Sequence, residues 1–213
     1  MRFENRADAG RKLAAKLDAY RGMRPLILAI PRGGVPLGRE VADALHGELD
    51  VVLVRKLGAP YNPEFAVGSV GESGKVIVAD YAARVGAGEQ YLAEEAERQL
   101  ALIRKRRAQY ASLHTSVSAK GRTVIVVDDG LATGATMRAA LDEIRHQQPA
   151  RLVCAVPVAS PDAAAYVRPF CDEWVCLSVE QDFDSVGWFY RDFRQVEDEE
   201  AIVLLAGPES RAG

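Results

Sequence analysis

Five short runs of β-branched and leucine residues alternate along the chain with segments that carry apolar residues at helical spacing. The runs cover residues 26–30, 51–54, 124–127, 152–158 and 174–179. Residues 35–46, with Val41 and Leu45 on one face, and residues 136–147 have the pattern of crossover helices. This alternation predicts an α/β fold with a central parallel sheet flanked by helices. Ligands of such sheets bind at the carboxyl ends of the strands.

The length of the chain suits one domain, residues 1–213, with additions to a single core. Between the second and third apolar runs the pattern changes. Residues 58–75 are rich in Gly, Pro and Asn, and residues 90–110 carry apolar side chains on one face of a long charged helix. We therefore expect an inserted flap, or hood, over residues 59–118. Interleaved aromatic and acidic residues indicate a C-terminal cap over residues 180–206.

Charge and hydropathy argue against several classes of partner. The formal net charge is -3, so neither nucleic acid nor an anionic membrane is a predicted partner. No run approaches the roughly 20 apolar residues that a transmembrane helix needs, and the start MRFENRADAGRK is too polar for a secretory signal. The sequence therefore predicts a cytoplasmic protein.

The three cysteines, Cys154, Cys171 and Cys176, lie in or beside apolar segments and form no C-x-x-C pair. We interpret them as buried thiols. Zinc binding is the alternative, but the three histidines of the chain show no ligand spacing.

The run TVIVVDDGLATGATM, residues 123–137, joins an apolar strand, two acids, a loop of small residues and the start of a helix. A strand this apolar is buried on both faces, so Asp128 and Asp129 emerge where it ends. Two adjacent ionised carboxylates repel each other, and this cost predicts a ligand that offsets it. Vicinal ribose hydroxyls with a nearby Mg²⁺ would do so, because carboxylate oxygens accept hydrogen bonds and bind hard cations.

The loop after the acids, residues 132–136, suits a phosphate. Its small residues let backbone N–H groups converge, and two threonine hydroxyls and the amino end of the next helix add donors. A ribose 5-phosphate lying along the loop would meet the acids at one end and this nest at the other. The alternatives are a Rossmann-type turn for another nucleotide, or a helix cap preceded by surface acids. Neither G-x-G-x-x-G nor G-x-x-x-x-G-K-[ST] is present.

The run VIVVDDGLATGAT resembles the motif with which type I phosphoribosyltransferases bind 5-phosphoribosyl-1-pyrophosphate (PRPP). In that family, apolar residues precede two acids and a small-residue loop with a Thr-Gly core. The resemblance implies that the acids hold the ribose hydroxyls and that the loop binds the 5-phosphate. The implied PRPP-binding residues of this run are Asp128, Asp129, Gly130, Leu131, Ala132, Thr133, Gly134, Ala135 and Thr136.

The sequence IPRGG, residues 30–34, follows the first strand and matches the same family. Two adjacent glycines can take unusual backbone angles and present amides to a second anion. In the family this is the pyrophosphate loop, which implies that Arg32, Gly33 and Gly34 face the leaving group. Taken alone, the same sequence is equally well explained as an ordinary strand-to-helix turn.

Arg55 and Lys56 end the second predicted strand, where two cations would neutralise pyrophosphate at the same edge of the sheet. A surface-exposed strand end is the alternative. The longer runs RKLGAPYNPEFAVG, residues 55–68, and WFYRDF, residues 188–193, resemble a bacterial group of phosphoribosyltransferases with no assigned acceptor. This wider resemblance covers nearly the whole chain and supports the type I fold.

The resemblance implies an enzyme of the glycosyltransferase class that transfers phosphoribosyl from PRPP to a nitrogenous base or related nucleophile, as in nucleotide salvage. The expected catalytic residues are Arg32, Lys56, Asp128 and Asp129. Mg²⁺ is the expected cofactor, bound mainly through PRPP, with the two acids as candidate protein ligands. No G-x-S-x-G elbow or motif histidine indicates a covalent nucleophile. The flap is expected to close over PRPP and exclude water.

The acceptor is not assigned by the sequence. Relatives that act on 6-oxopurines carry an acid where this chain has Ala132, so a 6-oxopurine is disfavoured and an adenine- or uracil-type loop is the closer resemblance. Trp188 and Phe189 are candidates for stacking on a base, with packing of the cap onto the core as the alternative. A non-catalytic PRPP-sensing regulatory protein is the second hypothesis, and a homodimer is left open. The pyrophosphate-side residues favour the enzyme.

Overall fold

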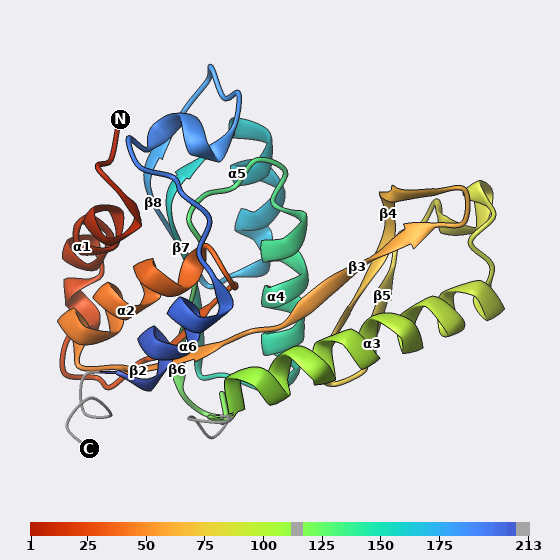
Figure 1. Ribbon diagram of the computed structural model, residues 1–213, viewed down its shortest axis with the longest axis horizontal. Coiled ribbons are helices and arrows are strands. Elements are labelled where there is room, and N and C mark those ends of the chain that lie inside the picture. The colour runs from red at the N-terminus through yellow and green to blue at the C-terminus, as the bar shows by residue number, and fades with distance from the viewer. Residues whose placement is uncertain (112–116, 208–213) are drawn as a thin grey trace.

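The computed structural model describes residues 1–111 and 117–207, and five parallel strands form its central sheet (Figure 1). The strand order is β2-β1-β6-β7-β8, and every neighbouring pair is parallel. The bounds are β1 Leu26–Ala29, β2 Glu48–Val51, β6 Thr123–Val127, β7 Arg151–Ala159 and β8 Glu173–Val179. The predicted α/β fold with a central parallel sheet is therefore confirmed.

One strand of this sheet lies earlier than predicted. The apolar run 51–54 covers the end of β2 and the beginning of the next strand, β3 (Val54–Ala59), and β2 itself contains two acids. Because of these acids, the sequence of β2 does not form an apolar run. Asp50 nevertheless lies in the interior, 2% exposed, because Arg107 donates a 2.8 Å hydrogen bond to its carboxylate.

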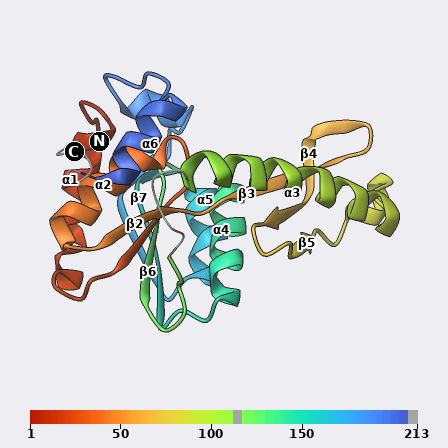
Figure 2. The same ribbon diagram turned by 60° about the horizontal axis from the view of Figure 1, so that its bottom comes forward.

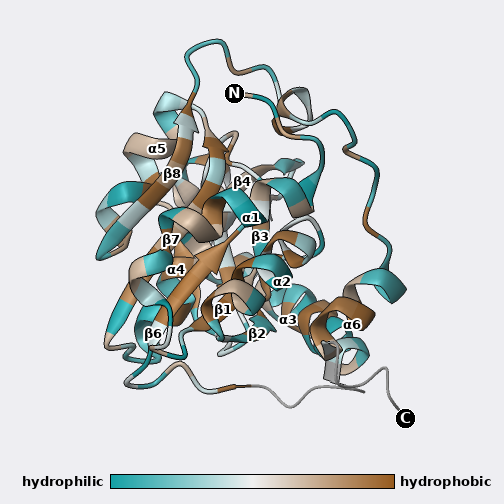
Figure 3. Ribbon diagram, turned by 90° about the vertical axis from the view of Figure 1, so that its left-hand side faces the viewer, coloured by the Kyte–Doolittle hydropathy of each residue, from teal (hydrophilic) through white to brown (hydrophobic). Residues whose placement is uncertain are grey.

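Helices cover both faces of the sheet, whose strands are largely hydrophobic (Figure 3). Residues Ile27 and Ala29 of β1 pack toward α1 and α2, and Leu26 and Leu28 pack toward α4 and α5. The helices are α1 Arg6–Lys16, α2 Gly34–Leu45, α3 Glu89–Ala111, α4 Ala135–His146, α5 Pro161–Val167 and α6 Asp198–Ala206, with short 3₁₀ helices at Asp18–Tyr20, Ala82–Val85, Arg168–Phe170 and Val186–Phe189. None of the helices in the described ranges is long and apolar enough to cross a membrane.

The hood projects from the core as an arm (Figures 1 and 2). Three antiparallel strands, β3, β4 (Asn62–Gly71) and β5 (Val76–Val78), form its sheet, and α3 lies along it. The arm begins at Val54, before the predicted start of the flap at residue 59, because β3 continues the chain directly from β2. Residues 112–116 of the predicted flap lie outside the described residues.

The base of the hood is tied to the core by buried polar contacts. Arg107 of α3 donates to Glu72 Oε1 at 2.6 Å, to Asp50 Oδ1 at 2.8 Å and to the Val51 carbonyl at 2.8 Å. On the other side, the buried Glu143 of α4 accepts hydrogen bonds from the backbone N and hydroxyl of Ser73, at 3.0 and 2.7 Å. Any closure of the arm must therefore bend beyond these anchors.

The first residues of the chain run beside the segment that precedes α6. Phe3 forms a parallel β-bridge with Tyr190, Phe3 N donates to the Phe189 carbonyl at 2.7 Å, and Arg191 N donates to the Phe3 carbonyl at 2.9 Å. The rings of Phe3 and Tyr190 pack at a centroid distance of 5.3 Å. This pairing brings the start of α1 and the C-terminal segment to the same place in the fold.

Candidate functional site

Asp128 and Asp129 follow directly after β6, at the carboxyl edge of the central sheet. Asp128 Oδ1 accepts a 2.8 Å hydrogen bond from Asp129 N, and Asp129 Oδ2 accepts a 2.8 Å hydrogen bond from Arg6 Nε. The remaining oxygens, Asp128 Oδ2 and Asp129 Oδ1, accept no hydrogen bond within the part of the chain that the structure describes. Each acid thus offers one acceptor oxygen to a ligand.

The environment of this pair disfavours ionisation. Loss of hydration, followed by the neighbouring charge of Asp129, raises the pKa of Asp128 well above its ordinary value. Burial also raises the pKa of Asp129, while the Arg6 guanidinium opposes that shift. A ligand that binds the charged carboxylates therefore relieves an unfavourable arrangement, which is typical of functional sites.

The glycines of the IPRGG sequence pack directly against the acids. A Cβ on Gly33 would lie 2.2 Å from Asp129 Oδ2, and one on Gly34 would lie 2.8 Å from the Val127 carbonyl oxygen. Gly33 has helical backbone angles, φ -59° and ψ -37°, and neither glycine has a positive φ. The glycines therefore do not use the unusual angles open to them; these positions need glycine for close approach to the acids and to β6. The Pro31–Arg32 peptide bond beside them is cis.

Arg32 extends from this turn toward the beginning of α6. Its Nη1 lies 3.5 Å from Asp198 Oδ1 and 3.7 Å from Glu197 Oε2. Asp198 Oδ1 also accepts a 2.6 Å hydrogen bond from Arg106 of the hood helix α3. The Arg32 side chain is 26% exposed, and both of its ion pairs are long, so these contacts contribute little to stability.

Both ends of the chain contribute residues that support Asp129, and sequence reasoning missed them. Tyr190 donates from its hydroxyl to the Asp129 carbonyl at 2.6 Å, and Arg6 binds the carboxylate. The hydroxyl pKa of Tyr190 is raised, first by burial and then by the charge of Asp129. The Asn5 cap of α1, whose side chain accepts from Asp8 N, is a sequence signal for the helix, but nothing local identifies the partner of Arg6.

The predicted phosphate loop is exposed where it would meet a ligand. Gly134, the N-cap of α4, has φ 77°, and a Cβ there would lie 2.6 Å from a Val167 methyl. The backbone N–H groups of Ala132, Thr133 and Gly134 have no acceptor within residues 1–111 and 117–207. Together with the unbonded amides of the first turn of α4, they form a set of donors of the kind that binds phosphate. The side chain of Thr136 is exposed beside them.

Gly130 and Leu131 join this loop to the core of the domain. Leu131 N donates to the Val158 carbonyl, Ser160 N donates to the Leu131 carbonyl, each at 2.9 Å, and the Leu131 side chain is only 3% exposed. A Cβ on Gly130 would lie 2.7 Å from Val186 Cγ1. Both residues therefore lie against the core while the following residues face outward.

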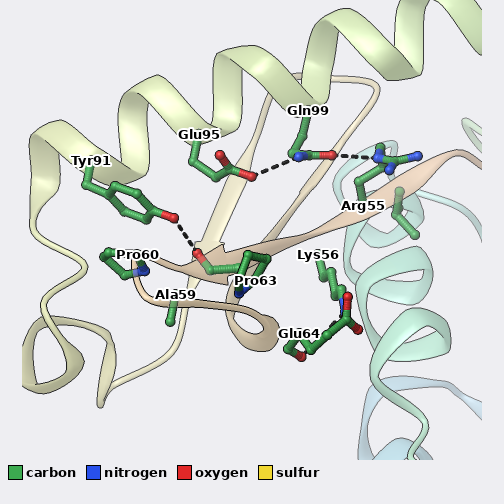
Figure 4. A pocket seen from close by; sticks show the side chains of 11 residues that line it. Arg55, Lys56, Ala59, Pro60, Pro63, Glu64, Tyr91, Glu95 and Gln99 are labelled. Atoms are coloured by element: carbon green, nitrogen blue, oxygen red, sulfur yellow. Dashed lines mark hydrogen bonds and ion pairs between the residues drawn. The ribbon is translucent and has the colours of Figure 1, made fainter.

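Arg55 and Lys56 are not at the end of a strand of the central sheet, so their predicted position is wrong. They lie on β3 in the hood, because β2 ends before them and the chain continues outward. Arg55 Nε donates to Gln99 Oε1 and Lys56 Nζ donates to Glu64 Oε2, each at 2.6 Å (Figure 4). Both line a pocket of about 450 Å³ between β3 and α3.

A second cavity, of about 800 Å³, separates the hood from α4. Lys56 and Arg55 line its hood side, and Thr133 and Thr136 line the opposite side. These two cations therefore share a cavity with the phosphate loop. The cation bound to the acid pair is Arg6, and Arg32 contacts Asp198 and Glu197 instead.

The chain matches the phosphoribosyl transferase domain over residues 2–192. It belongs to the phosphoribosyltransferase family.

Similar proteins and solved structures match nearly all of the chain. The TT1426 protein of Thermus thermophilus has a solved structure that is 49% identical, with a TM-score of 0.87 over 97% of this chain and 98% of that chain. Proteins of two Mycobacterium tuberculosis strains, CDC 1551 and H37Rv, named as phosphoribosyl transferases without an acceptor, are 39% identical over 204 residues. The chain spans 46% of the length of these curated relatives, about half. A Neisseria gonorrhoeae protein with bound ppGpp, 16% identical at a TM-score of 0.52, shares the fold alone.

The two candidate base-stacking residues of this chain have different environments. Phe189 is 5% exposed and packs on Phe183 at a centroid distance of 5.1 Å, so it is a core residue. Trp188 is 69% exposed and lines a pocket of about 720 Å³ with Met1 and Glu180. Only Trp188 therefore presents its ring to solvent.

The described residues contain no group of three or more His, Cys, Asp or Glu side chains that could hold a metal ion by themselves. The acid pair supplies two carboxylates, each with one oxygen that accepts no hydrogen bond from the described residues, and carboxylate oxygens are the ligand type that Mg²⁺ prefers. Cys154 is buried and Cys171 and Cys176 are partly buried, and burial raises the pKa of all three thiols.

Proposed function

We propose that this member of the phosphoribosyltransferase family binds PRPP with Mg²⁺ and transfers the phosphoribosyl group to a nitrogenous base or related nucleophile, with release of pyrophosphate. The observation that carries the proposal is the meeting of three features at one edge of the sheet: the open oxygens of Asp128 and Asp129, the glycine turn packed on them, and the exposed loop 132–136. Because the chain spans about half the length of its curated relatives, this proposal concerns the phosphoribosyltransferase domain.

The spacing of these features supports a role for each. Asp128 Oδ2 and Asp129 Oδ1 accept hydrogen bonds from the ribose hydroxyls, which strengthens both because the acceptors are charged. The loop amides and the amino end of α4 bind the 5-phosphate. Arg32 and the amides of its turn bind the pyrophosphate. Lys56 faces the cavity beside Thr133, so we assign its charge to the 5-phosphate side of PRPP.

Mg²⁺ fits the acid pair by the chemistry of its donors, with Asp128 and Asp129 as the residues that would hold it. When bound, the cation neutralises charge on the departing diphosphate. The chain's own contribution is electrostatic: the acids favour positive charge that develops on the ribose ring, and Arg32 favours negative charge on the leaving group. No covalent nucleophile is required.

Water must be kept from such a reaction because it competes with the acceptor. The hood is the segment that can cover the site, and its cavity opens toward the phosphate loop. Trp188 is the ring available for stacking on an aromatic acceptor.

The proposal is tested by incubating the chain with PRPP, Mg²⁺ and a panel of nucleobases and amines while pyrophosphate release is measured. Release that depends on one acceptor identifies the reaction. Tight PRPP binding without release for any acceptor favours the second hypothesis, a PRPP-sensing regulatory protein. Absence of PRPP binding contradicts both.

A further inference from the structure

Arg6, the first residue of α1, contacts the acid pair although it lies near the start of the sequence. Its Nε donates to Asp129 Oδ2 at 2.8 Å, and the two residues are 123 positions apart. The side chains are 11% and 13% exposed, so this ion pair is largely shielded from water. The contact engages one carboxylate oxygen and leaves Oδ1 of Asp129 without a partner in the described chain.

The guanidinium of Arg6 is itself held in one orientation. Its Nη1 donates to the Arg194 carbonyl at 2.7 Å, and its Cζ lies 3.8 Å from the centroid of the Phe193 ring. Phe193 packs in turn on Tyr190, at a centroid distance of 5.1 Å, and Tyr190 binds the Asp129 carbonyl. Two hydrogen bonds in its plane and a ring against its face fix the guanidinium.

Contacts on both sides restrict the Asp129 carboxylate. Gly33 lies so close to Oδ2 that no side chain fits between them, and Arg6 binds that same oxygen. Rotation of the carboxylate would break the ion pair in a shielded environment, where an unpaired charge is costly. The acceptor oxygen that remains is therefore held in a constant place.

We propose that Arg6 is a positioning residue that holds Asp129 so that its Oδ1 accepts a ribose hydroxyl. This inference rests on the proposed function. Arg6 does not touch the sugar; it acts through Asp129, and the C-terminal residues Phe193 and Arg194 act through Arg6. A lysine cannot replace it, because one ammonium nitrogen cannot reach both the carboxylate and the carbonyl in a flat geometry.

The test compares sugar phosphates that differ by one hydroxyl. Dissociation constants of ribose 5-phosphate, 2-deoxyribose 5-phosphate and 3-deoxyribose 5-phosphate are measured by calorimetry without Mg²⁺, for the wild-type chain, Arg6→Met and Arg6→Lys. The control is Arg191→Met, because Arg191 forms an exposed ion pair with Glu4 on the same segment. Thermal unfolding reports whether each variant is folded.

We expect the wild-type chain to bind ribose 5-phosphate about 10-fold or more tightly than at least one deoxy sugar, since a hydroxyl bonded to a carboxylate is lost. In Arg6→Met and Arg6→Lys this ratio should fall to about 2-fold or less, and in Arg191→Met it should remain unchanged. Should Arg6→Met fail to fold, Arg6→Lys and Phe193→Leu give the same comparison. A folded Arg6 variant that keeps the wild-type ratio overturns the inference about Arg6 but not the proposed function. A wild-type chain that binds none of the three sugars overturns the proposed function as well.

Discussion

Arg32 and Arg106 share one oxygen of Asp198: Arg32 Nη1 lies 3.5 Å from Oδ1, and Arg106 Nη1 donates to it at 2.6 Å. The glycine turn, the hood helix and α6 thus meet at a single carboxylate. Because Arg32 is the cation proposed to bind pyrophosphate, Asp198 competes with that ligand for it.

Replacement of Asp198 with Asn should therefore tighten pyrophosphate binding. Partly exposed ion pairs contribute about 0.2–1 kcal/mol, which corresponds to a gain of up to about 5-fold in affinity. Glu200→Gln is the control, since Glu200 lies on the same helix as Asp198 but pairs with Arg194 instead of Arg32. Isothermal titration with pyrophosphate measures the change, and weaker binding by Asp198→Asn would mean that this acid orients Arg32 for the ligand instead.

Gly33→Ala should damage the site because its Cβ would lie 2.2 Å from Asp129 Oδ2. Either the turn or the carboxylate must shift, so we expect a stability loss of about 1–3 kcal/mol and weaker PRPP binding. Gly88→Ala serves as control, since a Cβ at Gly88 meets no atom within 4 Å. Urea denaturation and PRPP titration check both effects, and an unaffected Gly33→Ala protein would show that the turn is not packed on the acid.

Asp128→Asn should stabilise the ligand-free protein at neutral pH. The pKa of Asp128 is raised in the folded state, so the folded protein holds this proton more tightly than the unfolded chain does. The favourable contribution is complete below the unfolded pKa and is lost as the pH rises through the folded value. Above that range the ionised acid lowers stability, so the melting temperature of wild type should fall relative to Asp128→Asn as the pH is raised. Parallel pH dependence of the two proteins would contradict the shift.

The same acids should be essential for the ligand. Each hydrogen bond between a sugar hydroxyl and a carboxylate contributes about 1.5–3 kcal/mol, so Asp128→Asn combined with Asp129→Asn should abolish measurable PRPP affinity while the fold remains intact. Asp43→Asn, on the exposed side of α2, is the matched control. Circular dichroism and PRPP titration separate the two outcomes, and retained affinity would assign the acids another role.

Arg107→Met should be among the most destabilising single changes in the hood. It leaves Asp50, 2% exposed, without its cation, and loss of one partner of a buried pair costs about 3–5 kcal/mol. Arg104→Met changes an exposed residue of the same helix and should alter stability by about 0.5 kcal/mol or less. Denaturant unfolding of both variants measures the difference, and similar values would mean that the anchor contributes little.

PRPP with Mg²⁺ should protect the hood from trypsin if residues 59–118 close over the site. Arg84 is an exposed cleavage site in this segment. The time course of cleavage is followed by mass spectrometry, and the doubly substituted Asp128→Asn, Asp129→Asn protein should gain no protection. Equal cleavage of the wild-type chain with and without ligand would count against closure.

Local sequence determined the parallel sheet, its crossover helices and the loop that follows the acids. These features depend on residues close together in the chain: the apolar run of β6, the two acids that end it, and the glycine at the start of α4. The bounds of the short strand β2 could not be predicted in this way, because its buried Asp50 is paired with Arg107, which lies far along the chain.

Tertiary structure alone decided which groups meet the acids. Arg6 and Tyr190 reach Asp129 from opposite ends of the sequence, and the partner of a long side chain is set by how the ends pair, which no periodicity encodes. The same applies to Lys56: its position in the sequence is that of a strand end, but the direction of β3 carries it into the hood. Periodicity specifies elements, whereas the contacts between distant elements depend on the packing of the whole chain.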